Sequence, residues 1–134
     1  VMKMGQVGTF GPIVFEVSDK RVLTFSELKQ TVSAQYSDHK LINHKPKKEY
    51  IGAGLRNIKF SMTLDATLGV RPQKMLTDLE FMTESGYADY LVIGNKPIGD
   101  NRFCITNISE AWDAVYSGGE LAKATVEITM EEYT

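Results

Sequence analysis

Three stretches of this chain alternate strictly between apolar and polar residues, and this pattern limits the possible folds more than any other feature. In residues 58–65 (IKFSMTLD) every second side chain is apolar, and residues 124–131 and 13–17 repeat the pattern. Because successive side chains of a strand point to opposite faces, the alternation predicts strands with one buried and one solvated face. Such strands are typical of antiparallel sheets and not of buried parallel ones.

One segment has a helical period instead. Its apolar residues, among them Leu76 and Leu79, fall on one face of a helix. Pro72 suits the first helical turn, and Gly86 suits the position just beyond the last. The pattern predicts one long helix over residues 72–85.

The end of the chain predicts a long β-hairpin. Residues 102–117 and 121–133 flank the glycine-rich turn SGGE, whose glycines supply the positive φ that a tight turn needs. The apolar register slips in the first of these strands, which predicts a bulge near Asn107. We therefore expect a mainly β (α+β) fold, and a length of 134 residues predicts one domain over residues 1–134.

Composition excludes some classes of protein. No apolar run approaches the roughly 20 residues that span a bilayer, and residues 1–11 hold no apolar stretch of the length expected in a secretory signal. The net charge of −2 is unlike the basic excess of general nucleic-acid binders. One stretch is nevertheless basic, since residues 40–48 (KLINHKPKK) hold four lysines and no acid.

The stretch LVIGNKPIGDNRF, residues 91–103, has glycines on both sides of a lysine, as a phosphate-binding loop can have. Gly94 and Gly99 have the right spacing, but Asp100 and Asn101 stand where such a loop needs lysine and serine or threonine. The residues after Asn101 are typical of a strand and not of a helix. We expect a strand–loop–strand connection whose flanking runs pair.

Other motifs with chemical meaning are equally incomplete. Gly52 and Gly54 lack the third glycine of a dinucleotide-binding motif, and a turn or a close backbone approach explains them better. Four nearby side chains could bind a metal, yet they match no known zinc spacing: His39, His44, Asp38 and Glu49. With no recognisable catalytic group, we expect no enzyme, no metal and no cofactor.

Several stretches together resemble the tail protein U (GpU) family of P-two-like phages. They are KPKKEYIGAGL, FSMTLDATLGVRP and YLVIGNKPIG, in the family's order, with GTFGPIVFEVS before them and TVEITMEEY after them. The resemblance covers the chain from about Gly8 to Tyr133. Residues 1–8 then form an N-terminal arm, either flexible or in contact with another subunit.

The resemblance implies a fold and a role. The fold is an antiparallel β-sandwich or barrel of the tail-tube type with one flanking helix. The role is that of a structural protein in a contractile phage tail or a related bacteriocin, assembled in the host cytoplasm. Its subunits would form a ring, expected to be a hexamer, that joins the tail tube to the baseplate hub or a LysM-type baseplate protein. The ring would template the tube and let DNA pass without binding it.

If the chain forms such a ring, we expect one set of residues to line its channel and another set to contact neighbouring subunits. The polar faces of the two best strands are expected to line the channel, because a channel that passes DNA should not be basic: Lys59, Ser61, Thr63, Asp65, Thr125, Glu127, Thr129 and Glu131. Residues 40–54 are expected to form a loop that reaches a neighbouring subunit or ring. The contact residues are then Lys40, His44, Lys45, Lys47 and Lys48, with Lys96 from the 91–103 stretch.

Alternatives stay open at this point. The basic stretch could instead touch nucleic acid or remain a solvated loop. The ring could be a tail terminator at the far end of the tube. A protein of another class, a small ligand-binding β-barrel or an enzyme that uses flavin or nucleotide, would be a monomer with bound cofactor.

Overall fold

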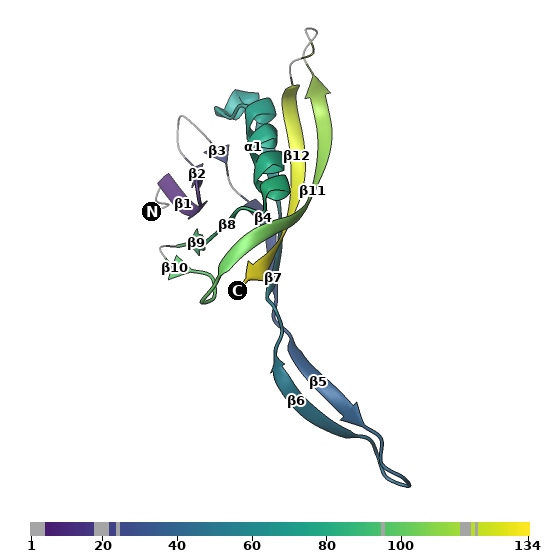
Figure 1. Ribbon diagram of the computed structural model, residues 1–134. Coiled ribbons are helices and arrows are strands. Elements are labelled where there is room, and N and C mark those ends of the chain that lie inside the picture. The colour runs from purple at the N-terminus through teal and green to yellow at the C-terminus, as the bar shows by residue number, and fades with distance from the viewer. Residues whose placement is uncertain (1–4, 18–21, 24, 95, 116–118, 120) are drawn as a thin grey trace.

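The computed structural model describes residues 5–17, 22–23, 25–94, 96–115, 119 and 121–134. Figure 1 shows a compact body of strands and one helix, from which a β-hairpin projects as a long arm. The expected mainly β, antiparallel class with one flanking helix is confirmed.

The body contains two five-stranded sheets, and the one with the longer strands is called the large sheet. Its order is β4-β7-β12-β11-β8, and the pairs are all antiparallel. The strands are β4 (Phe25–Thr31), β7 (Asn57–Asp65), β8 (Ala88–Asp89), β11 (Arg102–Val115) and β12 (Leu121–Tyr133).

The predicted C-terminal hairpin is confirmed as β11 and β12. The predicted bulge is confirmed too, since the register shifts between Ile105 and Asn107. In the turn between the strands, Gly119 has the positive φ that the sequence predicted, at 87°. Residues 117, 118 and 120 of that turn lie outside the described residues.

The smaller sheet has the order β10-β9-β1-β2-β3. Its strands are β1 (Gly5–Phe10), β2 (Ile13–Val17), β3 (Val22–Leu23), β9 (Leu91–Ile93) and β10 (Lys96–Pro97). Residues 5–8 thus belong to β1, which pairs with β2 and β9, and not to a free arm. Residues 1–4 of the expected arm lie outside the described residues.

The pairing predicted around residues 91–103 is wrong. The flanking runs do form strands, β9 and β11, but β9 pairs with β1 and β10 while β11 pairs with β12 and β8. The stretch therefore connects the two sheets. Gly94 and Gly99 supply the positive φ that the turns need, at 63° and 70°.

One helix covers the large sheet. α1 (Pro72–Ser85) follows a single 3₁₀ turn, η1 (Ala66–Leu68), and ends at Gly86 with a φ of 72°. These bounds confirm the predicted helix. Its buried side chains, with Leu76 and Leu79 fully buried, face β11, β12 and β7. In the described part of the chain no helix has the length and apolarity that crossing a bilayer requires.

The core lies between the large sheet on one side and α1 with the small sheet on the other. The alternating apolar residues of β7 and β12 face it and are buried, from Ile58 to Leu64 and from Ala124 to Met130. The two sheets meet at an aromatic contact, where Phe15 of β2 packs edge-on against Phe25 and Phe60, with ring centroids 5.4 and 6.0 Å apart. The polar residues of β7 and β12 lie on the opposite face of the large sheet.

Candidate assembly interfaces

The arm is a two-stranded hairpin of β5 (Ala34–His39) and β6 (Lys47–Ala53). It leaves the body between β4 and β7 and points away from it (Figure 1). The expected loop over residues 40–54 is therefore wrong in part, because residues 47–53 form a strand. Only residues 40–46 are a turn, with Asn43 in the left-handed region at a φ of 59°.

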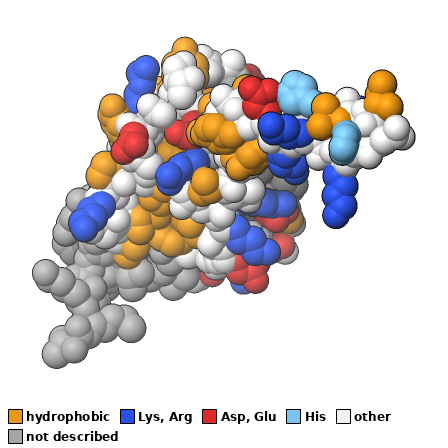
Figure 2. Space-filling view, turned by 90° about the horizontal axis from the view of Figure 1, so that it is seen from below, with side chains coloured by type: hydrophobic (Ala, Val, Ile, Leu, Met, Phe, Trp, Pro, Cys, Tyr) orange, Lys and Arg blue, Asp and Glu red, His pale blue; other side chains and the backbone are white. Residues whose placement is uncertain are grey.

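Basic side chains gather on this arm, where the sequence predicted them. Lys40, His44 and Lys45 lie in the turn, and Lys47 and Lys48 lie at the start of β6; all five are exposed. Figure 2 shows lysine and histidine side chains along the projecting arm, next to apolar ones. The structure thus brings five of the six predicted contact residues together.

Lys96, the sixth, lies elsewhere. It begins β10, at the edge of the small sheet, and its side chain is exposed. It is therefore not part of the basic arm, and a contact through Lys96 would involve a different surface.

Apolar side chains on the arm were missed by the sequence reasoning. Tyr36 and Tyr50 pair across the two strands with ring centroids 5.5 Å apart, yet remain 52% and 57% exposed. Ile51 is 62% exposed and Ile42, at the tip, is 88% exposed. Tyr50 stands beside the lysines in the sequence, but its pairing with Tyr36 only becomes visible once the hairpin is formed.

The side chains of the arm contact mainly one another. Lys48 Nζ lies 5.5 Å from the centre of the Tyr36 ring, and His39 Nε2 lies 2.6 Å from Glu49 Oε2. A lone two-stranded hairpin is marginally stable in water, because stability needs a third strand or a packed face. An arm with this much exposed apolar surface is therefore suited to contact another molecule.

The root of the arm is fixed to the body by Glu132 of β12. Its carboxylate accepts hydrogen bonds from the backbone N–H of Arg56, at 2.6 Å, and from Asn101 Nδ2, at 3.0 Å. The hydrogen bond from Asn101, followed by the one from Arg56, lowers the pKa of Glu132. Gly54 also approaches Ser33 so closely that an added Cβ would lie 2.5 Å from the Ser33 hydroxyl. Glycine at this position thus permits a close approach, as the sequence predicted.

The polar face of the large sheet carries all eight residues predicted to line a channel. They lie away from the core face: Lys59, Thr63 and Glu127 are exposed, and Ser61, Asp65, Thr125, Thr129 and Glu131 are half-buried. The register of β7 and β12 places them in neighbouring pairs, such as Ser61 beside Glu127. Whether this face lines a channel stays a prediction.

Asp65 has a local structural role. Its carboxylate accepts hydrogen bonds from the backbone N–H of Thr67 at 2.9 Å and from the Thr67 hydroxyl at 2.7 Å. It thereby caps the η1 turn, and these bonds, the hydroxyl one first, lower its pKa.

The large sheet has an open edge at each end. β4 pairs only with β7 among the described strands, and the outer edge of β11 pairs with β8 only at Phe103 and Cys104. Within the described residues, β11 from Ile105 to Val115 therefore has no strand on its outer side. Unpaired edges of this length are templates for another strand.

The main surface hollows among the described residues do not coincide with the phosphate or dinucleotide motifs considered in the sequence. One of about 670 Å³ is open and lined by residues around the start of α1, such as Arg71 and Lys74. In the described ranges no three metal-ligating side chains lie close enough to hold an ion. Of the four candidate ligands, the structure joins His39 to Glu49 as a pair.

Comparison with known protein families agrees with the resemblance seen in the sequence. Among solved structures, the chain is similar to one chain of "Tail of empty GTA particle computed with helical refinement, C6 symmetry", with 16% identity and a TM-score of 0.44 over 97% of this chain and 91% of that one. No curated protein matches the chain. The sequence model of the Phage P2 GpU family matches residues 11–134, nearly the full length. The chain belongs to the Phage P2 GpU family.

Proposed function

We propose that this chain is a structural subunit of a contractile phage tail or tail-like particle. Its subunits form a ring, a hexamer, that joins the tail tube to the baseplate hub and serves as the template on which the tube polymerises. The family match supports a structural role in a tail. The finer assignment of ring and position is our proposal.

The observation that carries the proposal is the arm. It exposes paired tyrosines, isoleucines and four lysines, which the described part of the body leaves uncovered. Such a surface is costly for a free monomer but is suited to an assembly in which a neighbour covers it. The arm is therefore the element that reaches the next subunit or ring.

The open edges of the large sheet support a closed ring. β4 and β11 lie at opposite sides of the same sheet, so one surface of a subunit can meet a different surface of the next. A contact between two different surfaces closes into a ring when the rotation between subunits allows it. The polar face of β7 and β12 would then turn toward the axis, where DNA passes.

The charge of that face fits passage without binding. Of the eight predicted channel residues three are acidic and one, Lys59, is basic. DNA binding depends on a basic surface that releases counterions from the phosphates. We expect no salt-dependent binding of duplex DNA by the assembled ring, and a mobility-shift assay with duplex DNA tests this; a retarded band that salt abolishes would contradict it.

The proposal predicts a defined oligomer. Native mass spectrometry and sedimentation of the purified chain should give a hexamer or a larger assembly without bound ligand. The triple variant K45E/K47E/K48E should stay folded, by its circular dichroism spectrum, but fail to assemble. A monomer at all concentrations, or unimpaired assembly of the triple variant, would refute the arm contact. A monomer with a bound cofactor would favour a ligand-binding protein instead.

A further inference from the structure

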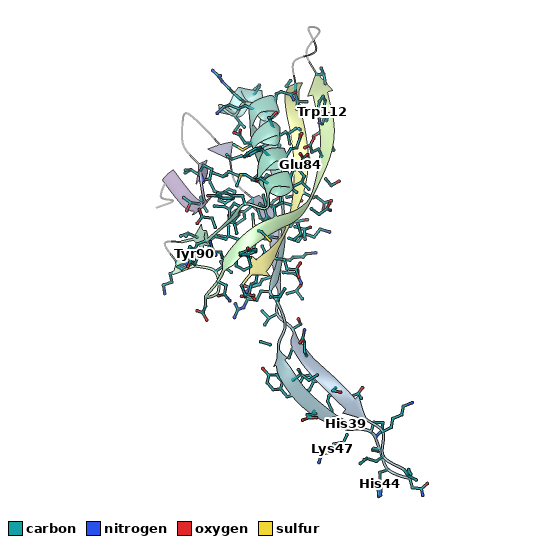
Figure 3. All side chains as sticks on the ribbon, in the orientation of Figure 1. His39, His44, Lys47, Glu84, Tyr90 and Trp112 are labelled. Atoms are coloured by element: carbon teal, nitrogen blue, oxygen red, sulfur yellow. The ribbon has the colours of Figure 1, made fainter. Side chains whose placement is uncertain are left out.

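A surface on the body of the protein complements the exposed surface of the arm. It is made by Glu80 and Glu84 of α1 with Glu110 and Trp112 of β11, and it is called the acidic tryptophan patch. Trp112 donates a hydrogen bond from Nε1 to Glu110 Oε1 at 3.3 Å, and its side chain is still 53% exposed. Figure 3 shows Glu84 on the helix and Trp112 on the neighbouring strand.

The strand register explains this grouping. Glu110 and Trp112 pair with Val126 and Ala124, which are core residues, so all four side chains lie on the face of the sheet that α1 covers. On this face α1 leaves Trp112 about half exposed. The helix contributes Glu80, whose pKa is raised by Glu110 of β11, and Glu84, one helical turn further along the same side of α1.

The patch concentrates negative charge. Hydrogen bonding with Glu110, then burial and the nearby charges of Glu110 and Glu84, raise the pKa of Glu80. Between described residues the ion pairs are His39–Glu49 and Lys74–Asp78, so none involves the patch. Like charges held this close favour a basic partner.

The arm matches the patch in both charge and apolar character. Residues 34–53 carry four lysines against two acids, a formal charge of +2, and exposed isoleucine and tyrosine side chains lie among them. Within one molecule the two surfaces cannot meet, because the arm tip and Trp112 lie at opposite ends of the protein (Figure 3). A contact between them therefore requires a second copy.

We propose that the acidic tryptophan patch is the docking site for the arm of a second copy of this chain. Lys45, Lys47 and Lys48 of one copy face Glu80, Glu84 and Glu110 of the next. An apolar side chain of the arm covers Trp112. The contact joins two different surfaces, so each subunit can place its arm on the next one and accept the arm of the one before it. The inference rests on the proposed function, which it deepens by naming the acceptor.

Charge reversal tests the pairing. The variant E80K/E84K/E110K should raise the protein concentration for half-assembly about tenfold or more, because like charges across an interface cost over about 1.4 kcal/mol. Combining it with K45E/K47E/K48E should restore assembly. Asp78→Lys is the control, since Asp78 lies on the opposite side of α1 and this variant should assemble normally. Circular dichroism of each variant checks its fold.

Trp112 offers a second readout in the unaltered protein, because it is the only tryptophan. Its fluorescence emission should shift to shorter wavelength when the subunits assemble and return when they are diluted apart. This measurement needs no variant and does not depend on how any variant folds.

The outcomes separate the two proposals. If E80K/E84K/E110K assembles normally, if the combined variant fails to recover, or if Trp112 emission stays unchanged on assembly, the acceptor is wrong. The arm contact of the proposed function would still stand, provided K45E/K47E/K48E alone blocks assembly. If that arm variant assembles normally, the arm contact of the proposed function fails, and the docking site with it.

Discussion

At the scale of single residues, Gly8 shows how closely the small sheet is packed. It lies in β1 beside β9, and a Cβ at this position would overlap the carbonyl oxygen of Val92. A backbone atom cannot move aside as a side-chain end can. We expect Gly8→Ala to lower the free energy of unfolding by about 1–3 kcal/mol, as overpacking does.

Gly52 is the matched control for this prediction. It also lies in a strand, β6, but an added Cβ would meet nothing within 4 Å. Gly52→Ala should leave the free energy of unfolding nearly unchanged. Urea titration of both variants measures the difference. Equal stability of the two would contradict the packing of β1 against β9.

Glu132 makes a pH dependence predictable at the same scale. Its pKa is lowered from the ordinary 4.5 by hydrogen bonds at the arm root. A lowered pKa stabilises the fold above the ordinary value, and this contribution is lost as pH falls from about 4.5 through the lower value. Glu132→Gln should therefore be less stable than the original chain at pH 7 and lose less stability between about pH 5 and 3. Thermal melts of both proteins across this pH range test the prediction. Equal losses of stability in the two proteins would contradict it.

At the scale of elements, the arm should contribute to assembly and little to folding. Gln35 pairs directly with Gly52, so residues 36–51 can be replaced by Asn-Gly as a two-residue hairpin turn. The shortened chain should have an unchanged or slightly raised melting temperature, since the removed side chains are almost all exposed. It should not assemble. Unfolding of the shortened chain would show that the arm belongs to the core after all.

The elements that sequence could predict are those with one face in the core. β7 and β12 alternate because Phe60 and Val126 face inward while Lys59 and Glu127 face solvent. α1 was predictable to the residue because Pro72 and Gly86 mark its ends. In these cases burial within the chain selects apolar residues at the period of the element.

The elements that sequence could not predict lack this signal. β5 and β6 are exposed on both faces, so no alternation separates an inside from an outside, and the sequence predicts a loop over residues 40–54. The sequence also could not show that β9 and β11 belong to different sheets. An alternating pattern indicates which face of a strand is buried but not which strand pairs with it. The acidic tryptophan patch joins α1 to β11, which are brought together only by the fold.

At the scale of the whole molecule, the surfaces of the protein divide by direction. The arm extends one way from the body (Figure 1). The open edges of the large sheet are at β4 and β11, and the polar face of β7 and β12 is a third surface. This arrangement lets one subunit meet lateral neighbours through its edges, another copy through its arm, and the channel through its polar face. The proposed ring uses all three at once.

The central claim is that these surfaces build a ring in a tail. A cryo-microscopy map of the assembled particle, at a resolution that separates strands, tests it most directly. We predict a closed ring of this subunit with Lys59, Thr63 and Glu127 facing the central channel and the arm seated on a neighbouring molecule. Density that places β7 and β12 with their polar face outward, or that shows the arm free in solvent, would contradict the account.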